Sequence, residues 1–253
     1  MIDLKSVKEI DKIRQAGIVV SEILQNLKIK ISPGVTTLEL DHLAADLMRQ
    51  KGVRSADLGY HGYPGHICVS LNEEVVHGIP SDRKIIRDGD LVSVDVTIEK
   101  DGFYADSAVT VIAGNGDVPE DIRKLVRVTE ESLNLGIVQA VIGNRIGDIS
   151  NAVQKYVEQN GFSVIREFIG HGIGRSMHEE PPVPNYGNPG KGPRLLEGMV
   201  LAIEPMVGMG RPEVDILEDD WTVVMQDGKP AAHFEHTIAV TRNGPVVLTR
   251  SKS

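Results

Sequence analysis

A pattern of two amphipathic helices followed by strands occurs twice in this sequence, and this repetition constrains the fold more than any other feature. Matching positions of the two copies lie 109 residues apart, as Gly34 and Gly143 do. Any two pairs of amphipathic helices can be aligned in this way, but the matched glycines favour a duplication. The interpretation is one domain, residues 1–253, in which two α+β halves of about 1–115 and 116–253 enclose a cleft.

The first helix pair has clear start and stop signals. Residues 6–9, SVKE, form a capping-box pattern in which Ser6 and Glu9 satisfy each other's free backbone donors. Apolar residues then recur at helical spacing as far as Leu27. A Pro-Gly pair interrupts the pattern, and a second helix is predicted from the Thr36 region to about Gly52. The second pair is predicted at about 119–141 and 148–159.

Strand patterns dominate the rest of the chain. The segments LVSVDVTI (91–98) and ADSAVTVIA (105–113) alternate apolar and polar residues, and Gly102 lies in the short connection, so a β-hairpin is predicted. Further strands are predicted near 163–168, 199–204, 221–225 and 231–241, separated by loops rich in glycine and proline.

The composition excludes several classes of protein. Hydrophobic residues are 41% and charged residues 25% of the chain, which is typical of a soluble globular protein. A net charge of −9 argues against a surface for nucleic acid or anionic membrane. Cys68 is the single cysteine, so no intramolecular disulfide forms. The charged N-terminus and the lack of a long apolar run predict no signal peptide, no membrane span and a cytoplasmic location.

Five residues stand at strand ends or inside apolar strands, where carboxylates and imidazoles are uncommon: Asp95, Asp106, His171, Glu204 and Glu235. Any one of them alone is more often solvated or paired with a basic side chain than catalytic. Four carboxylates brought together without basic neighbours would repel one another strongly. Divalent cations would hold them charged, and this set offers more ligands than one tetrahedral site uses. Two metal ions, about 3.5–4 Å apart, fit the set better.

The same five residues resemble, in order, the ligand set of the pita-bread metallopeptidases, and the flanking segments are similar to type I methionine aminopeptidases. The matching segments cover nearly the whole chain: GYHGYPGHICVSLNEEVVHGIP (59–80), LVSVDVTIEKDGFYADSAVT (91–110), GHGIGRSMHEEPPVPNYG (170–187), GMVLAIEPM (198–206) and DDWTVV with HFEHT (219–237). The resemblance implies an α+β pita-bread fold, with two halves related by a pseudo-two-fold axis, a curved antiparallel sheet and a central metal cleft.

The resemblance also implies how the metal site works. Asp95 would bind one ion, Asp106 and Glu235 would bridge both ions, and His171 and Glu204 would bind the second. A metal-bound hydroxide would attack the scissile carbonyl, with Glu204 accepting and passing on the proton. Cobalt, manganese, iron and zinc are all compatible with mixed oxygen and nitrogen ligands.

Substrate-contacting residues follow from the same resemblance. His77 matches a histidine close to the scissile amide, and His178 matches one that donates a hydrogen bond to the substrate carbonyl. A capped loop and a surface histidine are the ordinary alternatives for these two. Residues of the apolar methionine slot correspond to Tyr60, Tyr63, Cys68, Met177 and Trp221, although each of them alone also suits a plain core position.

A few positions depart from the family pattern. Met177 stands where an aromatic residue is common, and Asp57, near the pocket rim, replaces a neutral residue and could pair with the substrate α-amino group. The pair Gly65-His66 replaces a Lys-Ser type pair. Asn72 matches a residue close to a monovalent-cation site in some relatives.

The implied activity is removal of the initiator methionine from nascent polypeptides, with a small second residue preferred. Docking on the ribosome and a monomeric state are further expectations. Three alternatives stand beside this one. An X-Pro aminopeptidase or prolidase shares the ligands but usually has an additional N-terminal domain, and a non-catalytic relative would have lost ligands. A calcium-binding module is disfavoured by His171 and by the lack of a contiguous acidic loop.

Overall fold

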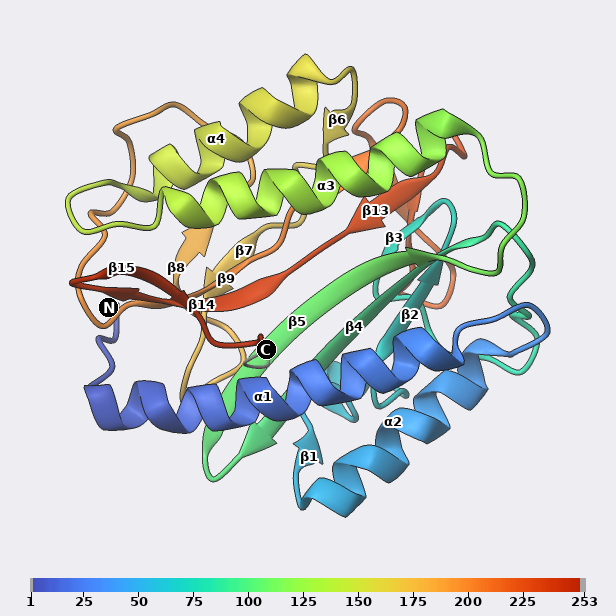
Figure 1. The fold of residues 1–253 in the computed structure, drawn as a ribbon, viewed down its shortest axis with the longest axis horizontal. Coiled ribbons are helices and arrows are strands. Elements are labelled where there is room, and N and C mark those ends of the chain that lie inside the picture. The colour runs from blue at the N-terminus through green and yellow to red at the C-terminus, as the bar shows by residue number, and fades with distance from the viewer. Residues whose placement is uncertain (1, 251–253) are drawn as a thin grey trace.

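A computed structural model describes residues 2–250 of the chain (Figure 1). Two pairs of helices flank a central layer of strands. In the view of Figure 1, α1 (Val7–Lys30) and α2 (Thr37–Lys51) lie below the strands, while α3 (Glu120–Val138) and α4 (Ile146–Gln159) lie above them. No helix within residues 2–250 combines the length and the apolar character needed to cross a membrane.

The helix ends confirm the signals in the sequence. The predicted capping box of Ser6 with Glu9 forms at α1, and Thr36 forms another with Glu39 at the start of α2. α2 ends at Gly52, which has a left-handed conformation (φ 66°) that glycine adopts without strain. α4 starts at Ile146, slightly earlier than predicted, since the side chain of Asp148 accepts a hydrogen bond from the backbone N–H of the preceding Arg145 (2.7 Å).

The strands form four hydrogen-bonded sheets in which every pairing is antiparallel. The first contains β1 (Arg54–Ser55), β2 (Cys68–Leu71), β4 (Leu91–Lys100) and β5 (Phe103–Ile112). The second contains β6 (Ser163–Val164), β10 (Met206–Gly208) and β13 (Ala231–His233). The third contains β3 (Glu74–Val76), β11 (Val214–Ile216) and β12 (Val223–Met225). The fourth contains β7 (Gly170–Gly172), β8 (Glu179–Val183), β9 (Val200–Ile203), β14 (His236–Thr241) and β15 (Gly244–Val247).

Two strand predictions were wrong in detail. The strand predicted near 163–168 is only two residues long, and the one predicted over 231–241 is interrupted. Glu235 therefore lies between β13 and β14 and does not open a strand. The strand is interrupted at Glu235 because its backbone N–H donates to Ala108 O in β5 (3.0 Å) and not to a partner strand of β13 or β14.

The β4–β5 hairpin separates a hydrophobic face from a polar one. Val94, Val96 and Ile98 of β4 are fully buried in the cluster that includes Ile13 and Val20 of α1. Since successive side chains of a strand point to opposite faces, the residues between them point away from α1. Asp95 is one of these residues, so the hairpin presents it on the face opposite to the helix.

The two halves meet along β5 and residues 233–237. Apart from the Glu235–Ala108 bond, Asp106 N–H donates to Thr237 Oγ1 (3.0 Å) and Ser107 Oγ donates to Glu235 O (2.6 Å). The junction is thus built from backbone and hydroxyl hydrogen bonds between segments far apart in sequence. The helix pairs have the offset that a duplication requires, while the duplication and the single-domain organisation remain predictions.

Candidate functional site

The β4–β5 hairpin supplies two carboxylates to the junction. In its register, Asp95 lies opposite Ala108 and Asp106 lies opposite Thr97. The two aspartates are therefore diagonal neighbours on one face, a relation that brings side chains of adjacent strands within reach. The hairpin alone fixes this part of the site.

His171 lies in the middle of β7, between two glycines. A Cβ atom on Gly170 would lie 2.4 Å from Ala202 O, and one on Gly172 would lie 2.3 Å from Glu180 O. Only glycine therefore allows β7 to lie so close to β9 and β8. The Nδ1 atom of His171 is 2.9 Å from Gly172 O, so Nδ1–H donates to that carbonyl and leaves Nε2 as a free acceptor.

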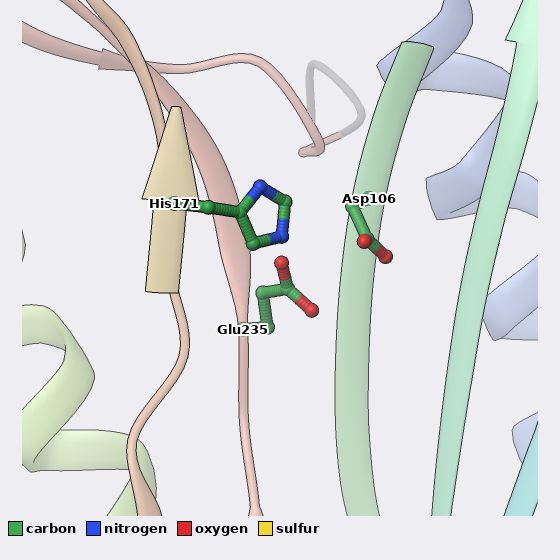
Figure 2. A group of neighbouring side chains, drawn as sticks. All are labelled: Asp106, His171 and Glu235. Carbon is green, nitrogen blue, oxygen red and sulfur yellow. The ribbon is translucent and has the colours of Figure 1, made fainter. Parts of the chain in front are cut away.

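The remaining two carboxylates come from the second half. Glu204 follows β9 directly, and its Oε1 is 3.5 Å from His171 Nε2. Glu235 lies at the junction, with only 2% of its surface exposed. Ligand atoms of Asp106, His171 and Glu235 all lie within 4.8 Å of one another, and Figure 2 shows the three side chains converging from two strands and the segment that carries Glu235.

The electrostatics of this cluster are unfavourable for the protein alone. Burial and then the charge of Asp106 raise the pKa of both Asp95 and Glu204 well above the usual range. Burial also raises the pKa of Asp106 to about 6, and burial with four neighbouring carboxylates raises the pKa of Glu235. Among the described residues, no lysine or arginine lines the surrounding cavity.

The hydrogen bonding indicates what compensates these charges. Within residues 2–250, the buried side-chain atoms without a hydrogen-bond partner include Asp95 Oδ1, Asp106 Oδ1 and Glu235 Oε1. Buried polar atoms in proteins are nearly always paired, so these oxygens point to a ligand. Four carboxylates and one imidazole with a free Nε2 are the donor set of divalent metal ions. The residues therefore fit a metal centre.

The five candidate ligands line a cavity of about 180 Å³. The apolar part of the lining contains Tyr63, Cys68, Met177 and Trp221. Tyr63 and Trp221 pack edge to face, with ring centroids 5.0 Å apart. The hydroxyl of Tyr63 donates to Gly78 O (3.0 Å), so the aromatic ring contributes only apolar surface to the lining. Burial raises the pKa of the Cys68 thiol, so this side chain stays neutral.

His77 and His178 also line this cavity. Burial lowers the pKa of His77 to about 4, so its imidazole is neutral at neutral pH. Burial lowers the pKa of His178 as well. The ring of His178 lies 4.3 Å from that of His171, and Tyr60 Oη is 2.9 Å from His178 Nδ1. When Tyr60 donates this bond, the His178 proton lies on Nε2.

The cavity also contains residues that the sequence did not single out. Phe168 packs against His77 with ring centroids 5.5 Å apart, and Met206 adds an apolar wall. His233 is 2% exposed, and its Nε2 has no hydrogen-bond partner among the described residues. Its position two residues before Glu235 was the available signal, because alternate residues of an extended chain share a face.

Asp57 lies deeper than the sequence suggested. Its carboxylate lines the cavity, and Oδ2 accepts a hydrogen bond from Thr97 N–H (3.4 Å). Burial, followed by the charge of Asp106, raises its pKa well above the usual range. A fifth carboxylate therefore lies near the metal ligands.

Asn72 lies outside this cavity, and its amide is already paired. Oδ1 accepts from Leu91 N–H (3.0 Å) and Nδ2 donates to Asp90 Oδ1 (3.0 Å), while its backbone carbonyl accepts from Ala231 N–H (2.9 Å). The side chain thus ties the end of β2 to the start of β4.

Comparison with known proteins agrees with this geometry. The model of metallopeptidase family M24 matches residues 11–242. A methionine aminopeptidase of Clostridium perfringens is 50% identical over 252 residues, with full coverage of both chains. The crystal structure of a methionine aminopeptidase from Thermotoga maritima superposes with a TM-score of 0.97 at 46% identity, covering 99% of this chain and 100% of that one.

A prolidase from Pyrococcus horikoshii superposes with a TM-score of 0.78 at 23% identity, and this chain covers 64% of its length. That likeness shows the shared fold alone. The chain belongs to metallopeptidase family M24, among its methionine aminopeptidases, and has the pita-bread fold that the sequence predicted.

Proposed function

We propose that this protein releases N-terminal methionine from peptides and nascent polypeptides whose second residue is small. The observation that carries the proposal is the cavity itself, whose lining combines five candidate metal ligands with the apolar side chains of the slot. An exopeptidase needs both features within one residue's length of each other. Membership of family M24 and the identity to methionine aminopeptidases support the same activity.

The proposed metal ligands are Asp95, Asp106, His171, Glu204 and Glu235, for two divalent ions of cobalt, manganese, iron or zinc. When bound, such ions polarise the scissile carbonyl and lower the pKa of water into the range where it serves as the nucleophile. The remaining chemistry belongs to the protein. Glu204 is proposed to accept the proton of the nucleophile, and its Oε1, 3.5 Å from His171 Nε2, supports this role.

His178 is proposed to stabilise the reacting carbonyl. Its lowered pKa keeps the imidazole neutral, and the bond to Tyr60 leaves the Nε2 proton available to the cavity. A neutral N–H donor aimed at the developing oxyanion lowers the barrier without a protonation step. His77, also neutral, is proposed to contact the scissile amide from the apolar side of the cavity.

The slot explains a preference for methionine. A flexible thioether fits a wall of Tyr63, Cys68, Met177 and Trp221, none of which offers a charge to the ligand. Tyr60, which is 36% exposed, lies at the mouth of the slot. Met177 is itself flexible, so we expect wider tolerance for norleucine or leucine than an aromatic residue would allow.

Asp57 is proposed to attract the substrate α-ammonium group. Its carboxylate lies near the proposed metal ligands, as the mutual charge effects with Asp95 and Asp106 show. A free N-terminus is the one cationic group that every substrate of an aminopeptidase has. We further propose a monovalent-cation site formed by the backbone near Asn72, as the sequence suggested.

The cellular setting is proposed from the activity. Nascent polypeptides are the substrates, so a cytoplasmic location near the ribosome follows, and a monomer of one catalytic domain suffices because the cavity is complete within one chain. Neither nucleic acid nor membrane is proposed as a partner.

The test is peptide turnover across a metal series, with metal content measured on the protein as purified. We expect the metal-loaded protein to release methionine from Met-Ala-Ser and to leave an Ala-Pro dipeptide intact. Asp95→Asn should abolish turnover, while Asp101→Asn, in the exposed turn of the same hairpin, should retain it. Preferential cleavage of the Ala-Pro dipeptide would replace this proposal with a prolidase-type activity. The shared fold is the only observation that supports that activity.

A further inference from the structure

The loop between β7 and β8 carries two residues of the proposed active site. Met177 and His178 lie at its end, just before β8 begins at Glu179. Both line the cavity, although the preceding residues Arg175 and Ser176 are exposed to solvent. The loop that carries these two side chains therefore also has contacts outside the cavity.

Glu179 closes this loop on itself. Its Oε1 accepts hydrogen bonds from the backbone N–H groups of Arg175 (2.7 Å) and Ser176 (3.0 Å). A carboxylate that accepts two backbone N–H bonds fixes the local chain path, because such charge-assisted bonds are among the stronger ones in proteins. The loop is thus folded around the side chain that follows His178.

Lys5 holds the other oxygen of Glu179. The Lys5 side chain is only 2% exposed, and its ammonium group forms an ion pair with Glu179 Oε2 and donates to Asp3 O (3.1 Å). Asp3 Oδ2 lies 3.3 Å away and completes the surroundings of the ammonium. Lysine is almost never buried to this extent without a partner, so the pairing with Glu179 is what allows the burial.

Two glycines allow Lys5 to approach so closely. A Cβ on Gly174, at the start of the loop, would lie 2.3 Å from Lys5 Cε, and one on Gly198 would lie 2.7 Å from Lys5 O. The backbone N–H of Lys5 also donates to Gly198 O (2.8 Å). The N-terminal segment is therefore packed against the loop from outside the cavity.

We propose that Lys5 is a positioning residue for the reaction, which holds the β7–β8 loop through Glu179 so that His178 and Met177 face the substrate. The inference rests on the proposed function, because it assigns a task to the residues that this function places in the cavity. Lys5 itself does not line the cavity and touches no proposed metal ligand. A change at Lys5 should thus alter rate and selectivity while metal binding stays the same.

The test compares Lys5→Met, Lys5→Arg and Glu179→Gln with the wild type on Met-Ala-Ser and on the same peptide beginning with norleucine. We expect Lys5→Met to lower kcat roughly 10- to 100-fold, the size expected when an active-site group moves by about 1 Å. Lys5→Arg, which keeps the charge, should recover most of the loss. Metal affinity, measured by titration calorimetry, should stay at the wild-type value for all three.

A matched control removes an ion pair that does not reach the loop. Lys51 pairs with Glu22 in an exposed setting, with side chains 43% and 39% exposed, so Lys51→Met should leave both substrates unaffected. The ratio of kcat/KM for methionine over norleucine does not depend on the fraction of folded enzyme. It should fall in Lys5→Met and in Glu179→Gln even where a preparation is partly unfolded.

An unchanged ratio together with an unchanged kcat per folded molecule, in either variant, would overturn the positioning role and leave the ion pair as a stability element. A loss of metal affinity in Lys5→Met would overturn it as well, because the effect would then pass through the metal ligands. Failure of the wild type itself to release methionine refutes the proposed function and is therefore distinguishable from failure of this inference.

Discussion

Replacing Asp106 by asparagine should have opposite effects on stability with and without metal. Asp106 is buried at the junction of the two halves, and its Oδ1 has no hydrogen-bond partner among the described residues. In the metal-free protein its charge is unfavourable, because burial raises the pKa to about 6 from the ordinary 3.8. Asparagine has nearly the same shape but no charge, so the substitution isolates this effect.

The magnitude follows from the difference between the two pKa values. A difference of about two pH units corresponds to about 3 kcal/mol. Since the folded protein binds this proton more tightly than the unfolded chain, the penalty is absent below pH 3.8, grows up to about pH 6 and is complete at neutral pH. The buried amide still lacks a partner, which costs about 1–2 kcal/mol. We therefore expect metal-free Asp106→Asn to be more stable than the wild type by about 1–2 kcal/mol.

The assay is urea unfolding followed by circular dichroism, with EDTA or with saturating manganese. Metal at about 1,000 times its dissociation constant would stabilise the wild type by about 4 kcal/mol. The variant, which lacks one ligand, should gain little, so the order of stability inverts when metal is added. At pH below 3.8 only the cost of the unpaired amide remains, so the metal-free variant should there be less stable than the wild type by about 1–2 kcal/mol. A metal-free variant that is less stable than the wild type at neutral pH would refute the argument that these carboxylates have no compensating positive charge when metal is absent.

Three further predictions address other parts of the molecule. Met177→Phe should reduce turnover of peptides beginning with leucine or norleucine relative to methionine, measured as ratios of kcat/KM, and unchanged ratios would remove this residue from the slot. Glu9→Gln should lower stability by about 1 kcal/mol at neutral pH, an estimate reduced for solvent screening. The bond to Arg175 lowers the pKa of Glu9 from 4.5 to about 2, so the difference should vanish as pH falls through this range in denaturant titrations. Gly17→Ala should destabilise the fold by about 2–3 kcal/mol, because the new Cβ would lie 2.3 Å from Leu248 O, and an unaltered melting temperature would contradict this close packing.

The long elements of this fold could be predicted because their signals are local. A capping box and helical spacing concern residues a few positions apart, so Ser6 and Glu9 fix the start of α1 wherever the helix later packs. The same holds for the β4–β5 hairpin, whose turn and two strands are contiguous. Short strands such as β7 carry no comparable signal, since two of its three residues are glycines, which have little preference for extended structure.

The candidate metal ligands and most of the cavity lining could be named from the resemblance, while some of their surroundings could not. The resemblance to a known family placed Asp95 and Glu235 in one site, although no local pattern predicts that strands so distant along the chain meet. Phe168, His233 and Lys5 reach or support the site through contacts across the fold. Such contacts depend on packing between elements, which single-residue patterns do not record.

The junction of the halves explains why function and stability conflict at this place. The hydrogen bonds of Asp106 N–H with Thr237 and of Glu235 N–H with Ala108 join the halves through the backbones of two proposed ligands. The side chains of the same two residues repel each other when no metal is present. Backbone hydrogen bonds therefore bring together carboxylates whose charges the protein does not neutralise by itself. This lack of a compensating charge is what would make the site bind divalent ions tightly.

It follows that metal removal should loosen the contact between β5 and residues 233–237 before it affects the outer helices. Faster hydrogen exchange at Asp106 and Glu235 than at the buried turns of α1, in EDTA, is the measurable consequence.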